Sequence, residues 1–369
     1  MKSVLEPFFD QVISVKCGPE RESVDILDET LLPGKAERIQ IRDRAAMVEA
    51  IQKLRVRGAP AIGIFAAFGL AVLSRSYPEE KAAFFRQLEE DQKVLSAARP
   101  TAVNLSWALE RMVRAARAVE EKPAAAVREA LFAEAEAIQR EDVSICRGIG
   151  ENGFAILEEI RKKQGEKPLG ILTHCNAGTL ATSKYGTATA PMYVAIENGW
   201  KPEAMHVYCD ETRPLLQGAR LTSYELSRAG IPTSVQCDDM ASLLMQSGRI
   251  QVIFVGCDRV ADNGDAANKI GTSGLAILAK YYGIPFYVCA PTPTIDRKTK
   301  TGADIPIEMR NAEEIKSLWY REPMVPEGVD TSFNPAFDVT DHSLITGILT
   351  ERGICQAPYD EAFSALGID

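Results

Sequence analysis

The sequence contains no hydrophobic run long enough to cross a membrane. Its longest apolar stretch, "PAIGIFAAFGLAVL" at 60–73, is shorter than the ~18–20 residues of a spanning helix, and it predicts a buried helix. The segment "MKSVLEPFFDQVIS" at 1–14 lacks the apolar core of a signal peptide, because Glu6 and Pro7 interrupt it. We therefore expect a cytoplasmic protein with no membrane partner.

Paired cysteine motifs and an excess of basic charge are also missing. No two of the eight cysteines form a C-x-x-C pair, so reduced thiols are expected. Cys175, Cys209 and Cys257 all end predicted strands, which leaves a zinc site open, although no ligand spacing favours one. The net charge of −9 argues against nucleic acid as a partner, because phosphate backbones need a cationic face. A local basic pocket for a small anion is still compatible with this net charge.

The order of the predicted elements indicates an α/β protein of two domains. Two strands around a Pro-Gly turn are expected within 24–43, and helices are expected at 44–55, 60–74, 78–95, 101–120 and 122–163, the last with a break near "RGIGENG". Farther along, apolar runs alternate with stretches long enough for helices; the runs are 169–174, 204–209, 231–237, 251–257 and 284–289. This pattern predicts a mainly helical N-terminal domain with a short β start (1–143) and a C-terminal Rossmann-like doubly wound parallel sheet (144–369).

Polar residues follow several of these predicted strands. Ligands of such sheets bind outside the carboxyl ends of the strands, where Cys175 and Asp258 are expected. Cys175 is interpreted as a nucleophile, an acid–base group or a packed thiol. His174 is interpreted as a structural partner, because strand alternation points it away from Cys175. Asp258 would cap a helix or pair with Arg259, or it would transfer a proton if partial burial raised its pKa.

Two arginines precede predicted helices. In "VRGAPAIG" (56–63), Gly58 frees the backbone and Pro60 suits a first helical turn. The free N–H groups of that turn attract an anion, and Arg57 adds further donors. The alternative is an ordinary helix start with a solvent-facing arginine. Arg99 of "ARPTAVN" stands in a similar position, and alone it indicates little.

Two further segments carry candidate ligands. "ADNGDAANKIGT" (261–272) is expected to be a polar loop in which Asn268 and Lys269 precede a helix and bond a sugar hydroxyl or a phosphate. Neither a Walker motif nor G-x-G-x-x-G occurs, so a nucleotide is not indicated. In "DETRPLLQGARLTSYEL" (210–226), Pro214 is expected to open a helix with Gln217 one turn inside it. Spacing does not decide whether Gln217 binds substrate or the backbone.

Taken together, several stretches resemble the methylthioribose-1-phosphate isomerase family. The resemblance runs in order from about residue 25 to 350 and rests on "VRGAPAIG", "RPTAVNL", "THCNAG", "DETRPLLQGARLT", "NGDAANKIGT", "IPFYVCAP", "IPIE" and "NPAFDVT". By motif, it implies that Cys175 and Asp258 are catalytic. It also implies a set of substrate-binding residues, namely Arg57, Gly58, Ala59, Arg99, Gln217, Asn268 and Lys269.

The resemblance implies an aldose–ketose isomerase that acts on a sugar 1-phosphate and needs no cofactor or metal. Asp258 would be the general acid, and Cys175 the base or a stabiliser of the transition state. Hydrogen would move from C2 to C1 as a proton or as a hydride. The substrate would be 5-methylthioribose 1-phosphate or 5-deoxyribose 1-phosphate, and a homodimer is expected. A ribose-1,5-bisphosphate isomerase and a non-catalytic subunit of the initiation-factor relatives are the alternatives. Retention of both catalytic residues favours the enzyme.

These assignments predict how the site is built. Cys175 and Asp258 should follow different strands of one parallel sheet and converge at its carboxyl edge. Arg57 should reach the same pocket from the N-terminal domain, which would make the site an interdomain cleft.

Overall fold

The computed structural model describes residues 5–99, 103–165 and 167–368. The chain divides into two units, one made of residues 1–146 and 178–186 and the other of residues 147–177 and 187–369. The boundary expected from the sequence follows residue 143, and the expectation does not separate 178–186. Within the described ranges, no helix is long and apolar enough to cross a membrane.

The first unit begins with a small antiparallel sheet. After α1 (Glu6–Val12), the strands β1 (Val15–Cys17), β2 (Val24–Leu27) and β3 (Arg38–Ile41) pair in chain order. Val24 lies opposite Ile41, so β2 and β3 form the strand pair that the sequence predicts.

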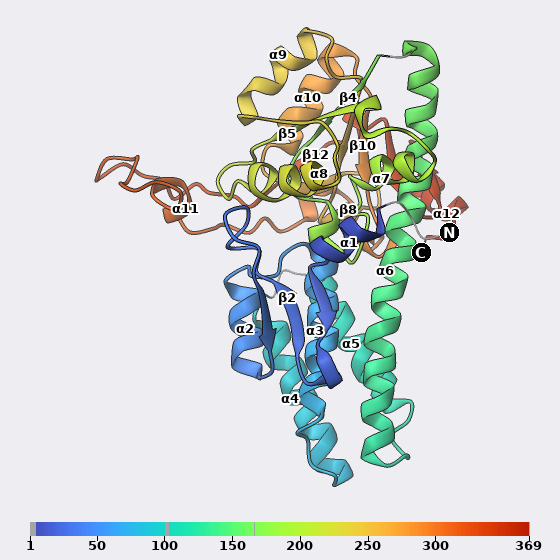
Figure 1. Cartoon of the computed structure of the whole chain (residues 1–369), viewed down its shortest axis with the longest axis vertical. Coiled ribbons are helices and arrows are strands. Elements are labelled where there is room, and N and C mark those ends of the chain that lie inside the picture. Colours follow the sequence, from blue (N-terminus) through green and yellow to red (C-terminus); the bar gives the residue numbers. More distant parts are fainter. Residues whose placement is uncertain (1–4, 100–102, 166, 369) are drawn as a thin grey trace. The chain divides into compact units, whose positions relative to one another are not determined.

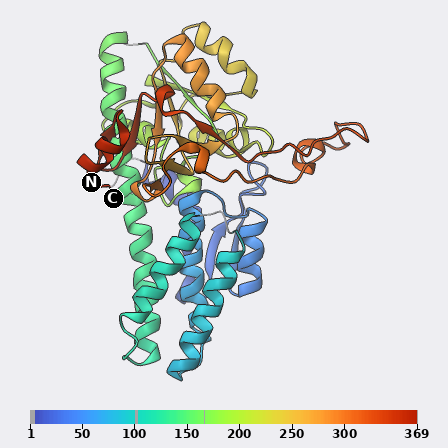
Figure 2. The same ribbon diagram turned by 180° about the vertical axis from the view of Figure 1, so that it is seen from behind.

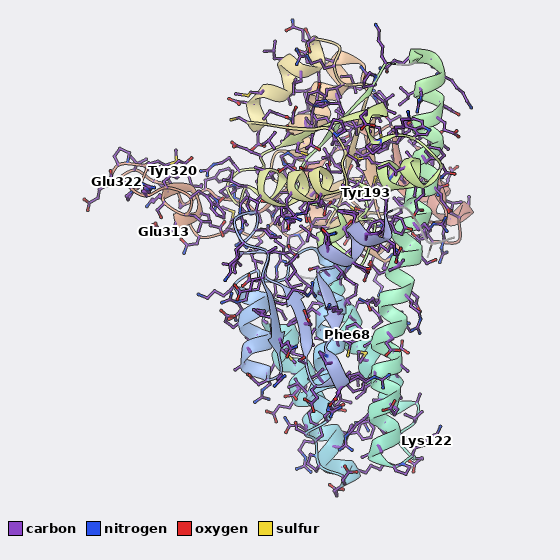
Figure 3. The ribbon with its side chains drawn as sticks, viewed as in Figure 1. Phe68, Lys122, Tyr193, Glu313, Tyr320 and Glu322 are labelled. Atoms are coloured by element: carbon purple, nitrogen blue, oxygen red, sulfur yellow. The ribbon has the colours of Figure 1, made fainter. Side chains whose placement is uncertain are left out.

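Helices follow this sheet along the chain, as predicted: α2 (Arg44–Gln52), α3 (Ala59–Ser74), α4 (Lys81–Ala97) and α5 (Val103–Arg117). Every residue of α3 from Ala61 to Ser74 is buried, because this helix is apolar on all sides and the others pack around it. Phe68, labelled in Figure 3, is one of its buried side chains.

The predicted break near "RGIGENG" is wrong. α6 (Ala124–Gln164) is one continuous helix, as Figure 1 shows. Its glycines serve packing instead. A β-carbon at Gly150 would lie 2.6 Å from Val194 Cγ2, and one at Gly153 would lie 2.3 Å from Pro191 Cγ. The glycines let the neighbouring α7 (Ala190–Glu197) approach the helix backbone closely.

The second unit is built on a seven-stranded sheet in the order β14-β13-β10-β7-β4-β5-β6. All neighbours are parallel except β13 and β14. With the parallel strands counted in chain order, this is the 3-2-1-4-5-6 order of Rossmann folds, so the predicted fold class is confirmed. The strands are β4 (Leu169–Thr173), β5 (Met205–Asp210), β6 (Thr233–Gln236), β7 (Val252–Val255), β10 (Phe286–Cys289), β13 (Gly347–Thr350) and β14 (Gly353–Cys355).

A second sheet of this unit is absent from the sequence prediction. Its order is β11-β8-β9-β12, with β8 (Arg259–Ala261), β9 (Ala266–Lys269), β11 (Ile295–Asp296) and β12 (Phe337–Thr340). The prediction of a polar loop over 261–272 is therefore wrong in part, because β9 is a buried strand. Its residues Ala-Ala-Asn-Lys lack the β-branched side chains that indicate a strand in a sequence.

The remaining helices of the second unit are α8 (Ser223–Arg228), α9 (Ala241–Gln246), α10 (Thr272–Tyr282), α11 (Glu313–Lys316) and α12 (Tyr359–Ala365). α11 belongs to an arm, residues 309–335, whose base is closed by a β-bridge between Met309 and Pro335. The arm extends away from the sheets of its own unit in both ribbon views (Figures 1 and 2). Glu313, Tyr320 and Glu322 lie along it (Figure 3).

Short turns of 3-10 helix occur at η1 (Pro19–Arg21), η2 (Thr179–Ala181), η3 (Pro202–Ala204), η5 (Asp238–Met240), η6 (Thr292–Thr294), η7 (Gly302–Asp304) and η8 (His342–Leu344). The segment η4 (Gly218–Thr222) is a π-helix.

Candidate active site

The two candidate catalytic residues follow neighbouring parallel strands. β4 and β7 pair directly, with Ile171 opposite Val252. The strand order reverses between these two strands, and ligands of doubly wound sheets bind at that point. Cys175 follows β4 and Asp258 follows β7, and both residues are partly buried. The expected placement after two different strands of one parallel sheet is therefore what the structure has.

Cys175 has an uncommon backbone conformation, with φ at 70°. Its N–H donates to Thr212 Oγ1 at 2.8 Å, and its carbonyl accepts from Thr222 Oγ1 at 2.6 Å. Its Sγ lies 3.3 Å from Gln217 Nε2, which donates to it. Both backbone groups and the thiol of Cys175 are thus held by polar side chains.

The local structure around Gln217 differs from the prediction. Pro214 stands in a turn and opens no helix, and Gln217 directly precedes the π-helix η4. Short π-helical turns are frequent at functional sites. Gln217 is 1% exposed, and its Oε1 has no hydrogen-bond partner in the described part of the chain. The Oδ1 of Asn176 is likewise buried and has no hydrogen-bond partner among the described residues. Two buried acceptors beside Cys175 therefore have no internal hydrogen-bond partner among the described residues, which is uncommon in folded proteins.

His174 is fully enclosed on the other side of the strand end. Its Nδ1 lies 3.1 Å from Asp210 Oδ2, and its Nε2 lies 2.9 Å from the Ile270 carbonyl. Burial alone would lower the pKa of His174, but the hydrogen bond and charge of Asp210, with the charge of Asp238, raise it above its ordinary value. Both ring nitrogens have hydrogen-bond partners inside the protein, so this residue is a structural partner, as the alternation predicts.

His174, Asp210 and Asp238 hold ligand-type atoms within 4.8 Å of one another. These atoms already have partners inside the protein, because Nδ1 of His174 lies beside Asp210 and Asp238 accepts the N–H groups of Thr212 and Arg213 at 2.8 Å each.

Asp258 lies at an irregularity of the second sheet. Its N–H donates to the Ala267 carbonyl at 2.9 Å, although the strand register pairs Ala267 with Arg259. Two successive residues therefore face one residue of β9, which is the arrangement of a β-bulge. Bulges often redirect a side chain beside an active site.

Asn268 and Lys269 lie on β9, next to this bulge. Both are buried, at 5% and 8% exposure. Asn268 Nδ2 donates to Thr272 Oγ1 at 3.0 Å, and Lys269 Nζ lies 4.1 Å from the centre of the Phe337 ring. Asp338 accepts the N–H groups of Gly271 and Ser273, and so caps the start of α10 beside them.

The candidate anion site lies in the first unit. Gly58 is the N-cap of α3, with φ at 94°, and as a glycine it offers no side chain to cap the N–H groups of the first turn. A β-carbon at Gly58 would lie 2.5 Å from Ala181, so both the backbone angle and the space require glycine. Arg57 and Ala59 flank it and are partly buried. This is the geometry in which helix starts bind phosphate.

Arg99 follows the end of α4 and is partly buried, and it directly precedes residues 100–102, which lie outside the described ranges. The convergence of Arg57 and Arg99 with the Cys175 site stays a prediction.

One contact near Gln217 is missed by the sequence analysis. Trp319 of the arm donates its Nε1–H to the Pro214 carbonyl at 2.7 Å, and the Arg220 guanidinium lies 4.4 Å from the centre of its indole ring. The arm is therefore fixed to the loop that leads into Gln217. No sequence motif links position 319 with 214, because the two are distant in the chain.

A family model described as "Initiation factor 2 subunit family" matches residues 55–357. The chain belongs to this family. It is 52% identical over 342 residues to a methylthioribose-1-phosphate isomerase of Symbiobacterium thermophilum, covering 92% of each chain. It is 48% identical over 360 residues to a 5-deoxyribose 1-phosphate isomerase of Clostridium botulinum, covering 96% of this chain and 99% of the other.

Solved structures of other proteins have the same fold. A 5-methylthioribose 1-phosphate isomerase from Pyrococcus horikoshii matches with a TM-score of 0.88 and 36% identity, over 99% of this chain and 98% of that one. The delta subunit of translation initiation factor eIF-2B from A. fulgidus matches with a TM-score of 0.83 and 35% identity, over 96% and 99%. The two sequence relatives are isomerases at about half identity, which confirms the expectation of an enzyme.

Proposed function

We propose that this protein is an aldose–ketose isomerase that converts 5-methylthioribose 1-phosphate to 5-methylthioribulose 1-phosphate. The observation that carries the proposal is the placement of Cys175 and Asp258 after β4 and β7, where the strand order reverses. The buried acceptors of Gln217 and Asn176 beside the thiol support a polyhydroxylated ligand.

The chemistry of the substrate requires groups of this kind. A sugar 1-phosphate is closed as an acetal, so its ring does not open unaided. In the proposed reaction, Asp258 donates a proton to the ring oxygen as its bond to C1 breaks. The hydrogen on C2 then moves to C1, the C2 hydroxyl gives its proton to the Asp258 carboxylate, and C2 becomes the ketone carbon. C1 is reduced and C2 is oxidised, so no external redox partner takes part.

Cys175 has one of two roles in the hydrogen transfer. As a base, it takes the C2 hydrogen as a proton and returns it to C1. As a neutral thiol, it stabilises the transition state while a hydride passes directly. Turnover in D₂O separates the two, because a thiol that exchanges with solvent leaves deuterium on C1 and direct hydride transfer leaves none.

The phosphate is assigned to the start of α3. Arg57 supplies charge-assisted hydrogen bonds, and the N–H groups after Gly58 supply the helix-end contribution. Lys269 and Asn268 on β9 are assigned to the sugar and its phosphate, and Arg99 to a further substrate contact. We further propose that the protein is cytoplasmic and acts as a homodimer.

The substituent at C5 is tested directly. The relatives named above act, by name, on methylthioribose 1-phosphate and on 5-deoxyribose 1-phosphate, so the second substrate is the alternative. Steady-state kinetics on both compounds and on ribose 1,5-bisphosphate, with the purified protein, should give the highest kcat/KM on the methylthio compound. A higher value on the deoxy compound would reassign the substrate. No turnover of any of the three would favour a non-catalytic subunit.

A further inference from the structure

Cys175, which follows β4, and Thr212 and Leu216, which follow β5, are non-glycine residues in the left-handed backbone region. The φ angles are 70° at Cys175, 63° at Thr212 and 56° at Leu216. This region is unfavourable for residues with a β-carbon, and most of all for a β-branched one such as Thr212. Such conformations persist only where surrounding contacts enforce them, and they gather at functional sites.

Two buried threonines supply these contacts at Cys175. Thr212 Oγ1 accepts a hydrogen bond from the N–H of Cys175, and Thr222 Oγ1 donates one to the carbonyl of Cys175. Both threonines are almost completely buried, at 0% and 1% exposure. Thr222 Oγ1 also accepts from Asn176 Nδ2 at 3.1 Å. The peptide groups on both sides of Cys175 are therefore fixed, and the thiol is directed to Gln217.

Thr212 is itself held by a charged cluster. Its hydroxyl donates to the Asp210 carbonyl at 3.0 Å, and its N–H donates to the Asp238 carboxylate. Asp238 Oδ1 also lies 4.0 Å from Nδ1 of the His174 ring. The carboxylate that holds the backbone of Thr212 therefore lies beside the buried imidazole. The residues of this cluster, His174, Asp210 and Asp238, have no role in the proposed chemistry.

We infer that Thr212 and Thr222 are positioning residues, which hold the Cys175 thiol in its reactive orientation through the backbone, and that Asp238 fixes Thr212 for this purpose. This inference rests on the proposed isomerase function. It assigns no chemical step to the threonines, because each hydroxyl proton is already donated to a backbone carbonyl.

The main test compares Thr222→Val, which keeps the shape and removes the hydroxyl, with Thr222→Ser, which keeps the hydroxyl. Thr340→Val is the matched control, because Thr340 is a buried threonine whose hydroxyl has no hydrogen-bond partner within the described ranges. For Thr222→Val, we expect kcat to fall at least about tenfold with KM within about threefold, the pattern of a transition-state interaction that is lost. Thr222→Ser and Thr340→Val should stay within about threefold of wild type in both constants.

A second readout does not depend on the isomerase reaction. The alkylation rate of each cysteine by iodoacetamide is measured over a pH series by mass spectrometry, with the exposed Cys237 as internal reference. Freeing the thiol from its fixed orientation should raise the rate at Cys175 at least about threefold in Thr222→Val and leave Cys237 unchanged. An unchanged or lower rate at Cys175 would overturn the inference, whether or not the wild type proves to be an isomerase.

If Thr222→Val does not fold, the backbone conformation is tested through Cys175 itself. Glycine ordinarily lowers stability relative to alanine, but it favours left-handed φ angles. Cys175→Gly should therefore unfold at the same urea concentration as Cys175→Ala or at a higher one. A clearly lower midpoint for the glycine variant would mean that the conformation is not enforced, and it would contradict the inference.

Discussion

Gly256 and Ala177 are so close that a β-carbon at position 256 would lie 2.6 Å from Ala177 Cβ. Gly256 directly follows β7, and Ala177 belongs to the turn after β4. The segment after β7, which carries Asp258, and the segment after β4, which carries Cys175, are therefore in contact close to the ends of the two strands. We therefore expect this contact to influence the spacing between the two candidate catalytic residues.

Gly256→Ala should push the two segments apart. We expect a loss of about 1–3 kcal/mol in the free energy of unfolding, the usual cost of overpacking, together with a fall in kcat. Urea denaturation and steady-state kinetics measure the two effects. Gly274→Ala is the control, because a β-carbon there would meet nothing within 4 Å and the residue lies inside α10. Equal behaviour of the two variants would mean that the contact between the segments has no importance.

Cys175→Ala and Asp258→Asn should remain folded and lose about 10²–10⁴-fold in kcat, the range for acid–base groups. Neither side chain lies in the hydrophobic core, since both are partly buried at the edge of the sheet. Circular dichroism and thermal unfolding check the fold. If a variant lost activity only because it unfolded, the replaced residue would have a structural role and not a catalytic one.

Arg57→Ala should raise KM for the phosphorylated sugar clearly and change kcat less, because the proposed contact is with the anion and not with the reacting carbons. Arg42→Ala, at an exposed arginine of the same unit, is the matched control and should leave KM unchanged. If KM is unchanged in Arg57→Ala, the start of α3 would be an ordinary helix start at which Arg57 binds no ligand.

The buried carboxyl of Asp142 should make stability depend on pH. Burial raises its pKa to about 6, even though it accepts the Ser183 N–H at 2.7 Å. A raised pKa means that the folded state binds the proton more tightly than the unfolded state. The stability from this group is therefore complete below its usual pKa of 3.8 and is lost as the pH rises to about 6.

Asp142→Asn should remove this loss and make the protein more stable than wild type at pH 8 by about 1–3 kcal/mol. Urea unfolding at pH 4, 6 and 8 measures the difference, with Asp10→Asn at an exposed aspartate as control. A variant less stable than wild type at pH 8 would show that the bond to Ser183 outweighs the cost of burying the charge.

Much of the fold can be predicted because its strands are strongly apolar. Ile171, Leu172 and the run Val252–Val255 indicate buried parallel strands by composition alone, and the strand ends then indicate Cys175 and Asp258. β9 is missed because Asn268 and Lys269 are buried polar residues, and a sequence pattern assigns such residues to loops. Tertiary contacts that are not visible in the sequence keep them in a strand.

The errors in α6 and around Gln217 have a common cause. Glycine and proline are ambiguous in a sequence, since they mark a break in one context and close packing or a turn in another. Gly150 and Gly153 allow contact with α7, and Pro214 stands in a turn before a π-helix. The left-handed conformation of Cys175 has no sequence signal at all, because it is enforced by threonines that are distant in the chain.

The proposed activity is the isomerisation of a 5-substituted ribose 1-phosphate, catalysed by Asp258 and Cys175. ¹H and ³¹P NMR of purified wild-type protein with 5-methylthioribose 1-phosphate test it most directly, with Asp258→Asn under the same conditions. The account predicts conversion to 5-methylthioribulose 1-phosphate by the wild type, and a rate about 10²–10⁴-fold lower for the folded variant. Conversion at an equal rate by Asp258→Asn, or no conversion by the wild type, would contradict it.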